Sequence, residues 1–209
     1  MGVNKTMNVC LDLHDWSPTH NRLEVLFKLR KVFPSFKVSL FTIPVDKSEN
    51  WGPYLIRRDV IDIVKGLDWV QLIPHGLFHE GSEMRKCDYD TFKNTILPSI
   101  EGSFEADGLS YEKGFCAPHW LWTDGVVKAL NEEGWWGAVD RDKVMPCPDK
   151  FYKYNFLLNE RFWEESGDLK LHGHVYGTKN DVGRCFGSLL RLPRDVEWHF
   201  VTDFLENKE

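Results

Sequence analysis

The sequence of 209 residues has no apolar run near the ~20 residues that cross a bilayer, so we expect no membrane-spanning segment. Its first residues, MGVNKT, lack the apolar segment of a secretory signal, and a cytoplasmic location is therefore expected. An excess of positive charge is also missing, because 26 Lys and Arg stand against 32 Asp and Glu. A net charge of −6 argues against a protein that binds nucleic acid by neutralising phosphates.

The cysteines show no pairing pattern. The five cysteines are Cys10, Cys87, Cys116, Cys147 and Cys185. Their number is odd and no Cys-x-x-Cys occurs, so neither a disulfide framework nor a cysteine zinc site is expected. The remaining composition, 42% hydrophobic and 28% charged, is that of a globular protein, and the length predicts one domain over residues 1–209. Nine Trp and 14 Phe make the chain rich in aromatic rings.

Segments with the apolar pattern of strands alternate along the chain with segments of helical periodicity. The predicted strands are residues 7–13, 38–43, 69–73, 113–116, 137–140, 169–175 and 199–204. The first predicted helix begins at Pro18, with Ser17 as its cap, and ends before Pro34. The other predicted helices are residues 55–65, 89–104 and 123–130, and a loop-rich stretch runs from 141 to 154. This alternation predicts an α/β fold of mostly parallel strands, either a barrel or a doubly wound sheet. Both architectures gather functional side chains at the C-terminal ends of the strands.

Polar side chains follow the first predicted strand. Asp12, His14 and Asp15 place two carboxylates and an imidazole within four residues. Asp15 or Ser17 alone could be explained as the cap of the following helix. That explanation does not cover His14 beside Asp12, so we take the group as a candidate site.

Two histidines follow the third predicted strand. His75 and His79 are four residues apart, a separation that puts two side chains on one face of a helical turn. Such a pair also arises by chance, with one histidine buried and one at the surface. Together with a carboxylate at another strand end, the pair forms a mixed nitrogen and oxygen ligand set. This set suits zinc, cobalt, nickel, iron or manganese and leaves coordination positions open.

Two further strand ends carry rings. The segment 114–122 stops at Pro118 and then presents His119, Trp120 and Trp122, where a carbohydrate ring could stack, although either tryptophan alone is more simply core. His172 and His174 lie on one face of a later predicted strand, because side chains alternate with period two. One of these histidines could serve as an acid, or the two could form a hydrogen-bonded pair inside a barrel.

These motifs resemble the polysaccharide deacetylase superfamily, also called NodB-like or carbohydrate esterase family 4, and its divergent branch with a His-Asp first motif. The first motif, His-Asp-Val-x-Pro, is matched by residues 14–18, HDWSP. The second, His-Gly-x-x-His, is matched by residues 75–79, HGLFH, and is the most specific of the four. The third, Gly-Phe-x-x-Pro-x-Trp, stands at residues 114–120, and the late histidine motif at 171–174, LHGH. The matches run in order over residues 7–177.

The resemblance implies a distorted (β/α) barrel of about seven strands and one divalent metal held by Asp15, His75 and His79. Zinc is the first candidate, with cobalt, nickel and manganese as alternatives. In this family, metal-activated water attacks an acyl carbonyl, a first-motif aspartate is the base, and a late histidine protonates the leaving amine. Here His14 stands at the base position, so His14 or Asp12 would take the proton, and His172 or His174 would be the acid, with His174 preferred as nearer the strand end.

A second departure concerns the third motif. The family's arginine, which orients the base, is absent there, and Phe115 occupies that region. The resemblance thus implies a metal-dependent hydrolase, acting on an amide or ester bond of an acetylated sugar or glycoconjugate and not on peptides. Pro118, His119, Trp120 and Trp122 would contact this substrate. The alternatives are an allantoinase-like hydrolase of another C–N bond and a non-catalytic carbohydrate-binding protein.

Overall fold

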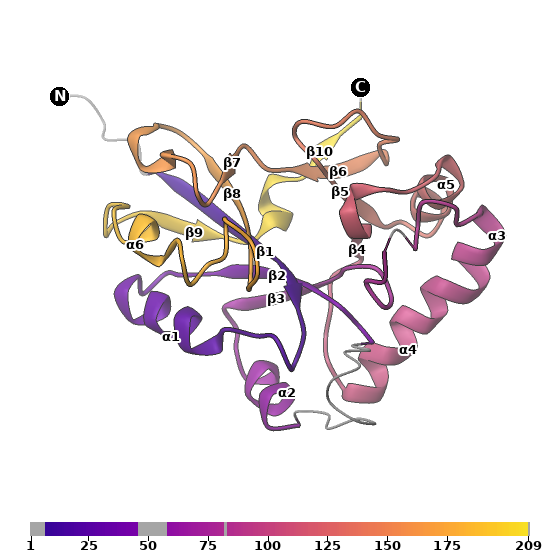
Figure 1. Cartoon of the computed structure of the whole chain (residues 1–209), viewed down its shortest axis with the longest axis horizontal. Coiled ribbons are helices and arrows are strands. Elements are labelled where there is room, and N and C mark those ends of the chain that lie inside the picture. Colours follow the sequence, from indigo (N-terminus) through magenta and orange to yellow (C-terminus); the bar gives the residue numbers. More distant parts are fainter. Residues whose placement is uncertain (1–6, 46–57, 82, 209) are drawn as a thin grey trace.

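A parallel sheet forms the centre of the computed structural model, which describes residues 7–45, 58–81 and 83–208 (Figure 1). The sheet has six strands in the order β3-β2-β1-β8-β7, with β9 also pairing with β1. Its strands are β1 (Asn8–Trp16), β2 (Val38–Thr42), β3 (Val70–Pro74), β7 (Phe156–Leu157), β8 (Leu169–His174) and β9 (Glu197–His199). Every pairing within this sheet is parallel, as the alternation of strands and helices predicts.

A second sheet continues the first. Its four strands, in the order β10-β6-β5-β4, are β4 (Gly114–Phe115), β5 (Trp136–Val139), β6 (Lys150–Lys153) and β10 (Glu206–Asn207). An isolated bridge between His75 and Cys116 links the end of β3 to the end of β4. On the far side of the second sheet, next to its edge strand β10, the chain leaves β6 and enters β7 after two residues, passing from one sheet to the other. The two sheets therefore form a distorted (β/α) barrel, which confirms the predicted fold class.

The helices lie outside the strands (Figure 1). They are α1 (Leu23–Val32), α2 (Arg58–Lys65), α3 (Tyr89–Thr91), α4 (Leu97–Asp107), α5 (Asp124–Glu132) and α6 (Phe186–Leu189). A π-helical turn, Phe92–Ile96, joins α3 to α4, so that the predicted helix 89–104 is one continuous helical segment. The wide turn comes just before Pro98, which cannot donate a backbone hydrogen bond to the preceding turn. Thr123 caps α5, its side chain accepting from the Val126 N–H.

The predicted start of the first helix is wrong. Ser17 does not cap a helix; its carbonyl and hydroxyl oxygens both accept from the His20 N–H, which closes a turn. The helix α1 begins only at Leu23, after Arg22 in the left-handed conformation. The Asn21 side chain accepts from the Leu23 N–H in this region. Residues 17–22 therefore form a polar loop at the mouth of the barrel.

Two other expectations need correction. Residues 199–204 are not one strand, because β9 ends at His199 and a 3₁₀ turn, Val201–Phe204, follows. The stretch expected to be loop up to Tyr154 contains β6, a strand of the second sheet. The beginning of the predicted helix 55–65 falls outside the described residues, and α2 covers the rest. Among the described helices, none is both long and apolar enough to span a bilayer.

Candidate metal centre and active site

The register of two central strands places four candidate residues together. In the parallel pairing of β1 with β8, Asp12 lies beside His172 and His14 lies beside His174. Residues opposite one another in such a pair project from the same face of the sheet. Asp12, His14 and His172 are each no more than 3% exposed. These side chains form two layers inside the barrel, with the pair of His14 and His174 nearer its mouth.

Asp15 reaches the same space because β1 is irregular at its end. Neighbouring residues of a regular strand point to opposite faces. The pairing of β1 with β2 shifts between Leu13 and Trp16, and Asp15 has a φ of 62°. Such an irregularity re-aims a side chain. As a result Asp15 and His14 both meet His75, Asp15 through a 3.3 Å contact and His14 through rings 4.5 Å apart.

The second motif supplies two imidazoles to Asp15. His75 Nε2 lies 3.3 Å and His79 Nε2 lies 3.1 Å from Asp15 Oδ1. His75 is held at the end of β3, where its Nδ1 makes a 3.0 Å hydrogen bond to the Cys116 carbonyl. The carbonyl can only accept, so Nδ1 carries the proton and Nε2 presents its lone pair. His79 follows four residues later with a φ of 56°, a value uncommon outside glycine.

This cluster fits a divalent metal. Two ligand atoms each ~2.0 Å from a tetrahedral zinc lie about 3.3 Å apart, which matches the separations from Asp15 to His75 and His79. The Nδ1 hydrogen bond of His75 is the outer contact that metal-bound histidines normally make. One carboxylate and two neutral imidazoles leave further positions for water and substrate. Asp15, His75 and His79 are therefore the residues that would hold the metal.

A second group, made of Asp12, His14 and His172, does not fit a metal as well. Asp12 Oδ1 lies only 2.5 Å from His172 Nδ1, a hydrogen-bond distance too short for two ligands of one ion. The other Asp12 oxygen accepts a 3.0 Å hydrogen bond from the Tyr152 hydroxyl. Asp12 is fully buried and both of its oxygens are engaged. Asp12 and His172 are therefore hydrogen-bonded to each other and are not placed as two ligands of one ion.

His14 lies between these two groups. Its Nε2 is 3.5 Å from Asp12 Oδ1 and has no hydrogen-bond partner among the described residues, although the atom is buried. A buried nitrogen without a partner costs free energy and marks a place where another molecule can bind. Burial, reinforced by the neighbouring histidines, lowers the pKa of His14 well below its ordinary value. The imidazole is thus neutral at pH 7, with one of its ring nitrogens unprotonated.

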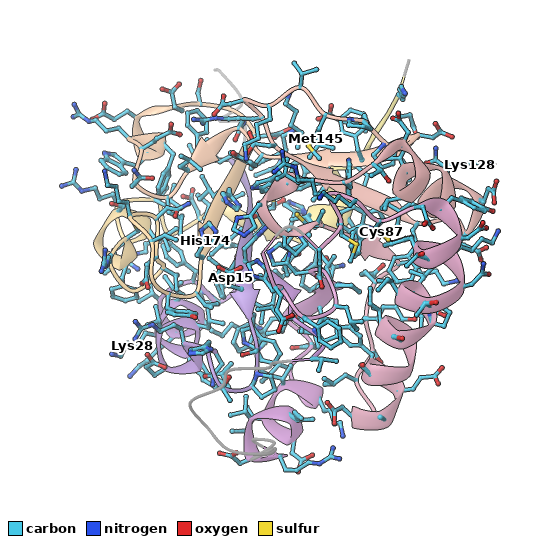
Figure 2. All side chains as sticks on the ribbon, turned by 45° about the vertical axis from the view of Figure 1, so that its right-hand side comes forward. Asp15, Lys28, Cys87, Lys128, Met145 and His174 are labelled. Carbon is cyan, nitrogen blue, oxygen red and sulfur yellow. The ribbon has the colours of Figure 1, made fainter. Side chains whose placement is uncertain are left out.

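His174 approaches Asp15 from the neighbouring strand β8, and Figure 2 shows the two side chains close together at the end of β1. His174 Nδ1 is 3.1 Å from the Asn180 amide oxygen, so this nitrogen is the donor. Its Nε2, 4.0 Å from Asp15 Oδ2, is left with a lone pair facing the site. Burial, followed by the nearby His172, lowers the pKa of His174 to about 4. Its side chain is 21% exposed, in contrast to 3% for His172.

Burial and mutual contacts shift the pKa values of Asp15, His75 and His79, which are together called the ligand cluster. Burial opposes charge on Asp15, but its close contacts with the imidazoles of His75 and His79 outweigh it and hold the pKa of Asp15 below its ordinary value. Burial lowers the pKa of His75. At His79 the effect of burial is outweighed by the hydrogen bond to Asp15, and the pKa is raised. Asp15 is therefore charged at neutral pH, as a metal ligand must be.

The segment 114–122 has some side chains at the site and others in the core. Trp120 lies over His14 and His172, with ring centroids 4.9 Å and 5.5 Å apart. His119 is exposed nearby, with its ring 5.8 Å from that of His79, and the buried Pro118 packs beneath Gly76.

Trp122 was expected beside Trp120, but the structure does not bring it to the site. It is 6% exposed and stacks on Phe115, and its indole N–H donates to the Pro146 carbonyl. The two tryptophans are two residues apart, but the 3₁₀ turn Pro118–Trp120 and the positive φ values of His119 and Trp120 separate their directions.

Sequence reasoning missed three contributors. Tyr152 holds Asp12, Tyr154 stacks on His172 at 4.6 Å, and Asn180 fixes the His174 ring. The alternation of Tyr152, Lys153 and Tyr154 was a local signal for a strand with two aromatic residues on one face. No local pattern marks Asn180.

Comparisons with known proteins agree with this fold. The chain superposes on the chitin deacetylase of the fungal pathogen Colletotrichum lindemuthianum with a TM-score of 0.60 and 13% identity, over 98% of this chain and 90% of that one. A family 4 carbohydrate esterase from Streptomyces lividans, in complex with acetate, gives 0.59 and 10% identity, over 88% and 86% of the two chains. A family 4 pseudoenzyme from Bacillus anthracis gives 0.57 and 13% identity, over 96% and 65%.

Sequence similarity alone does not identify a family for this chain. No protein-family profile matches it, and no curated protein matches it. The predicted resemblance to the polysaccharide deacetylase superfamily is nevertheless confirmed for the fold, because these solved structures share the architecture over nearly the whole chain.

Proposed function

We propose that residues 1–209 form a single catalytic domain that removes an acetyl or other acyl group from a sugar or glycoconjugate with the help of one divalent metal. The observation that carries this proposal is the spacing of the Asp15, His75 and His79 ligand atoms at the mouth of the barrel. Zinc is the first candidate, and cobalt, nickel and manganese suit the same ligands. Such an ion lowers the pKa of water towards neutrality and polarises a carbonyl.

Two histidines would move the protons. Both oxygens of Asp12 are engaged, which favours His14 as the base that takes the proton of the attacking water. The free Nε2 of His174 favours this residue over His172 as the group that protonates the departing amine or alcohol. Because His174 is neutral at pH 7, it must receive a proton before it gives one. The rings of His14 and His174 are 5.7 Å apart, so this transfer needs at most a short path.

The proposed substrate class comes from the structural neighbours and the mouth of the site. One neighbour is a chitin deacetylase and another a family 4 carbohydrate esterase. Trp120 is half-buried beside His14, and His119 is exposed next to it. Ring faces of this kind pack well against the apolar face of a sugar.

Metal content tests the proposal first. Untagged wild-type protein, dialysed against zinc, cobalt, nickel or manganese, is analysed by elemental mass spectrometry beside Asp15→Ala and His75→Ala. We expect close to one ion per chain in the wild type and none in either variant. His199→Ala is the matched control, because His199 pairs with Cys10, five residues before the proposed ligand Asp15 on β1. A wild type without metal would refute the hydrolase mechanism.

Acetate release tests the chemistry. The metal-loaded protein is incubated with acetylated chitin and xylan oligosaccharides, and acetate is measured with an enzyme-coupled assay. His14→Ala and His174→Ala should keep the metal and lose turnover, a loss of ~10²–10⁴-fold being usual for a group that transfers protons. Full activity in both variants would contradict the assigned roles.

A non-catalytic carbohydrate-binding protein is the second candidate. Two observations favour it: His14 and Phe115 stand where the family has its catalytic aspartate and arginine, and one structural neighbour is a pseudoenzyme. In that case His75→Ala leaves glycan affinity intact and no acetate is released by the wild type. In the enzyme, the same variant abolishes turnover.

A further inference from the structure

We propose that Glu83 is the positioning residue of the metal centre, holding in place the loop that presents His79 to the ion. This inference rests on the proposed function. Its basis is a set of three hydrogen bonds from consecutive backbone N–H groups to one carboxylate. Leu77 N–H donates to Glu83 Oε1 at 2.8 Å, Phe78 N–H to Oε2 at 3.2 Å, and His79 N–H to Oε1 at 3.3 Å.

The loop needs such an acceptor. After β3 ends at Pro74, residues 75–79 form neither helix nor strand, so the backbone donors at 77–79 have no ladder partners within an element. Leu77 is 4% exposed, and a buried N–H without an acceptor is costly. Successive N–H groups that converge in this way form a concave binding place for an anion. Glu83 supplies that anion from the same chain.

Gly76 makes room for the carboxylate. It has a φ of +67°, and a Cβ built at this position would lie 2.0 Å from Glu83 Oε1 and 2.7 Å from Pro118 Cγ. Any side chain there would displace the carboxylate or the proline. The glycine of the His-Gly-x-x-His motif and Glu83 are therefore parts of one arrangement.

The hydrogen bonds to Glu83 position His79 more than His75. His75 is held independently, by its bridge to Cys116 and by its own N–H donating to the Thr42 carbonyl at 2.7 Å. His79 has no strand around it and a φ of 56°, a conformation that must be maintained by its surroundings. Its N–H bond to Glu83 fixes that backbone and so the direction of the imidazole towards Asp15. Without Glu83, His79 would have to be ordered by the metal itself.

The test is the metal affinity of the whole protein. Metal-free wild type and Glu83→Gln are titrated with Co²⁺ against a chromophoric chelator, and the visible absorption of bound Co²⁺ reports its coordination. Outer contacts of this kind are typically worth ~10–100-fold in metal affinity, and we expect a loss in that range with an altered Co²⁺ spectrum. Glu105→Gln, in an exposed position of α4, is the matched control and should bind as the wild type does.

The outcomes separate the two proposals. A wild type that binds no Co²⁺ overturns the proposed function and this inference with it. If the wild type binds Co²⁺ and Glu83→Gln has the same affinity and spectrum, only the role of Glu83 is wrong, even if the variant unfolds at a lower temperature. Should Glu83→Gln fail to fold, Glu83→Asp takes its place, because it keeps the charge and shortens the reach to the loop.

Discussion

Replacing His174 with glutamine should weaken the dependence of stability on pH in the metal-free protein. The pKa of His174 is about 4 in the folded chain, against an ordinary value of 6.5. Below pH 6.5 the unfolded chain therefore binds a proton that the folded chain excludes, and stability falls as the pH drops towards 4. At ~1.4 kcal/mol per pKa unit, this single group costs about 2 kcal/mol between pH 7 and pH 5.

The assay is urea unfolding, followed by tryptophan fluorescence in the presence of EDTA at pH 7, 6 and 5. The wild type should lose about 2 kcal/mol more than His174→Gln over this interval, since the other titrating groups are common to both proteins. His119→Gln removes an exposed imidazole from the mouth of the site and serves as the control. Parallel curves for the wild type and His174→Gln would refute the buried, neutral state of this imidazole.

Two further predictions follow from the site and its surroundings. Apparent metal affinity should rise by up to ~10-fold per pH unit from pH 6 until the raised pKa of His79 is passed, because His79 must lose its proton to bind the ion. Chelator competition at several pH values measures this, and an affinity that does not change with pH would contradict the prediction. Trp122→Ala should lower the free energy of unfolding in urea by ~3–5 kcal/mol without changing the metal content. Trp120→Ala should chiefly weaken glycan binding. Loss of metal from a folded Trp122→Ala variant would contradict the assignment of Trp122 to the core.

The local patterns of the chain predicted the architecture and most of the ligand cluster. Alternating strand and helix signals are properties of contiguous residues, and they were sufficient for a parallel α/β fold. They also placed Asp15, His75 and His79 at strand ends, which meet at one mouth of a parallel barrel. Boundaries were less predictable: the Ser17-Pro18 pattern is typical of a helix start, but here Ser17 closes a turn instead.

The directions of the side chains and their hydrogen-bond partners depended on the tertiary structure. Asp15 joins His14 on one side of β1 only because the strand is irregular there, and Trp122 turns into the core only because the backbone of His119 and Trp120 takes positive φ values. The engagement of Asp12, which decides between it and His14 as the base, comes from Tyr152 and His172, 140 and 160 residues away along the chain.

Residue types and their order are thus enough to say which groups gather at the mouth of the barrel, since strand ends converge there whatever the details of the loops. Which atom of each group is free, and which is already held by a partner, follows from hydrogen bonds between distant segments. Asn180 on His174 and Glu83 on the loop of His79 are such partners. These bonds form only once the strands are paired, because packing creates the buried donors and acceptors that must then be satisfied.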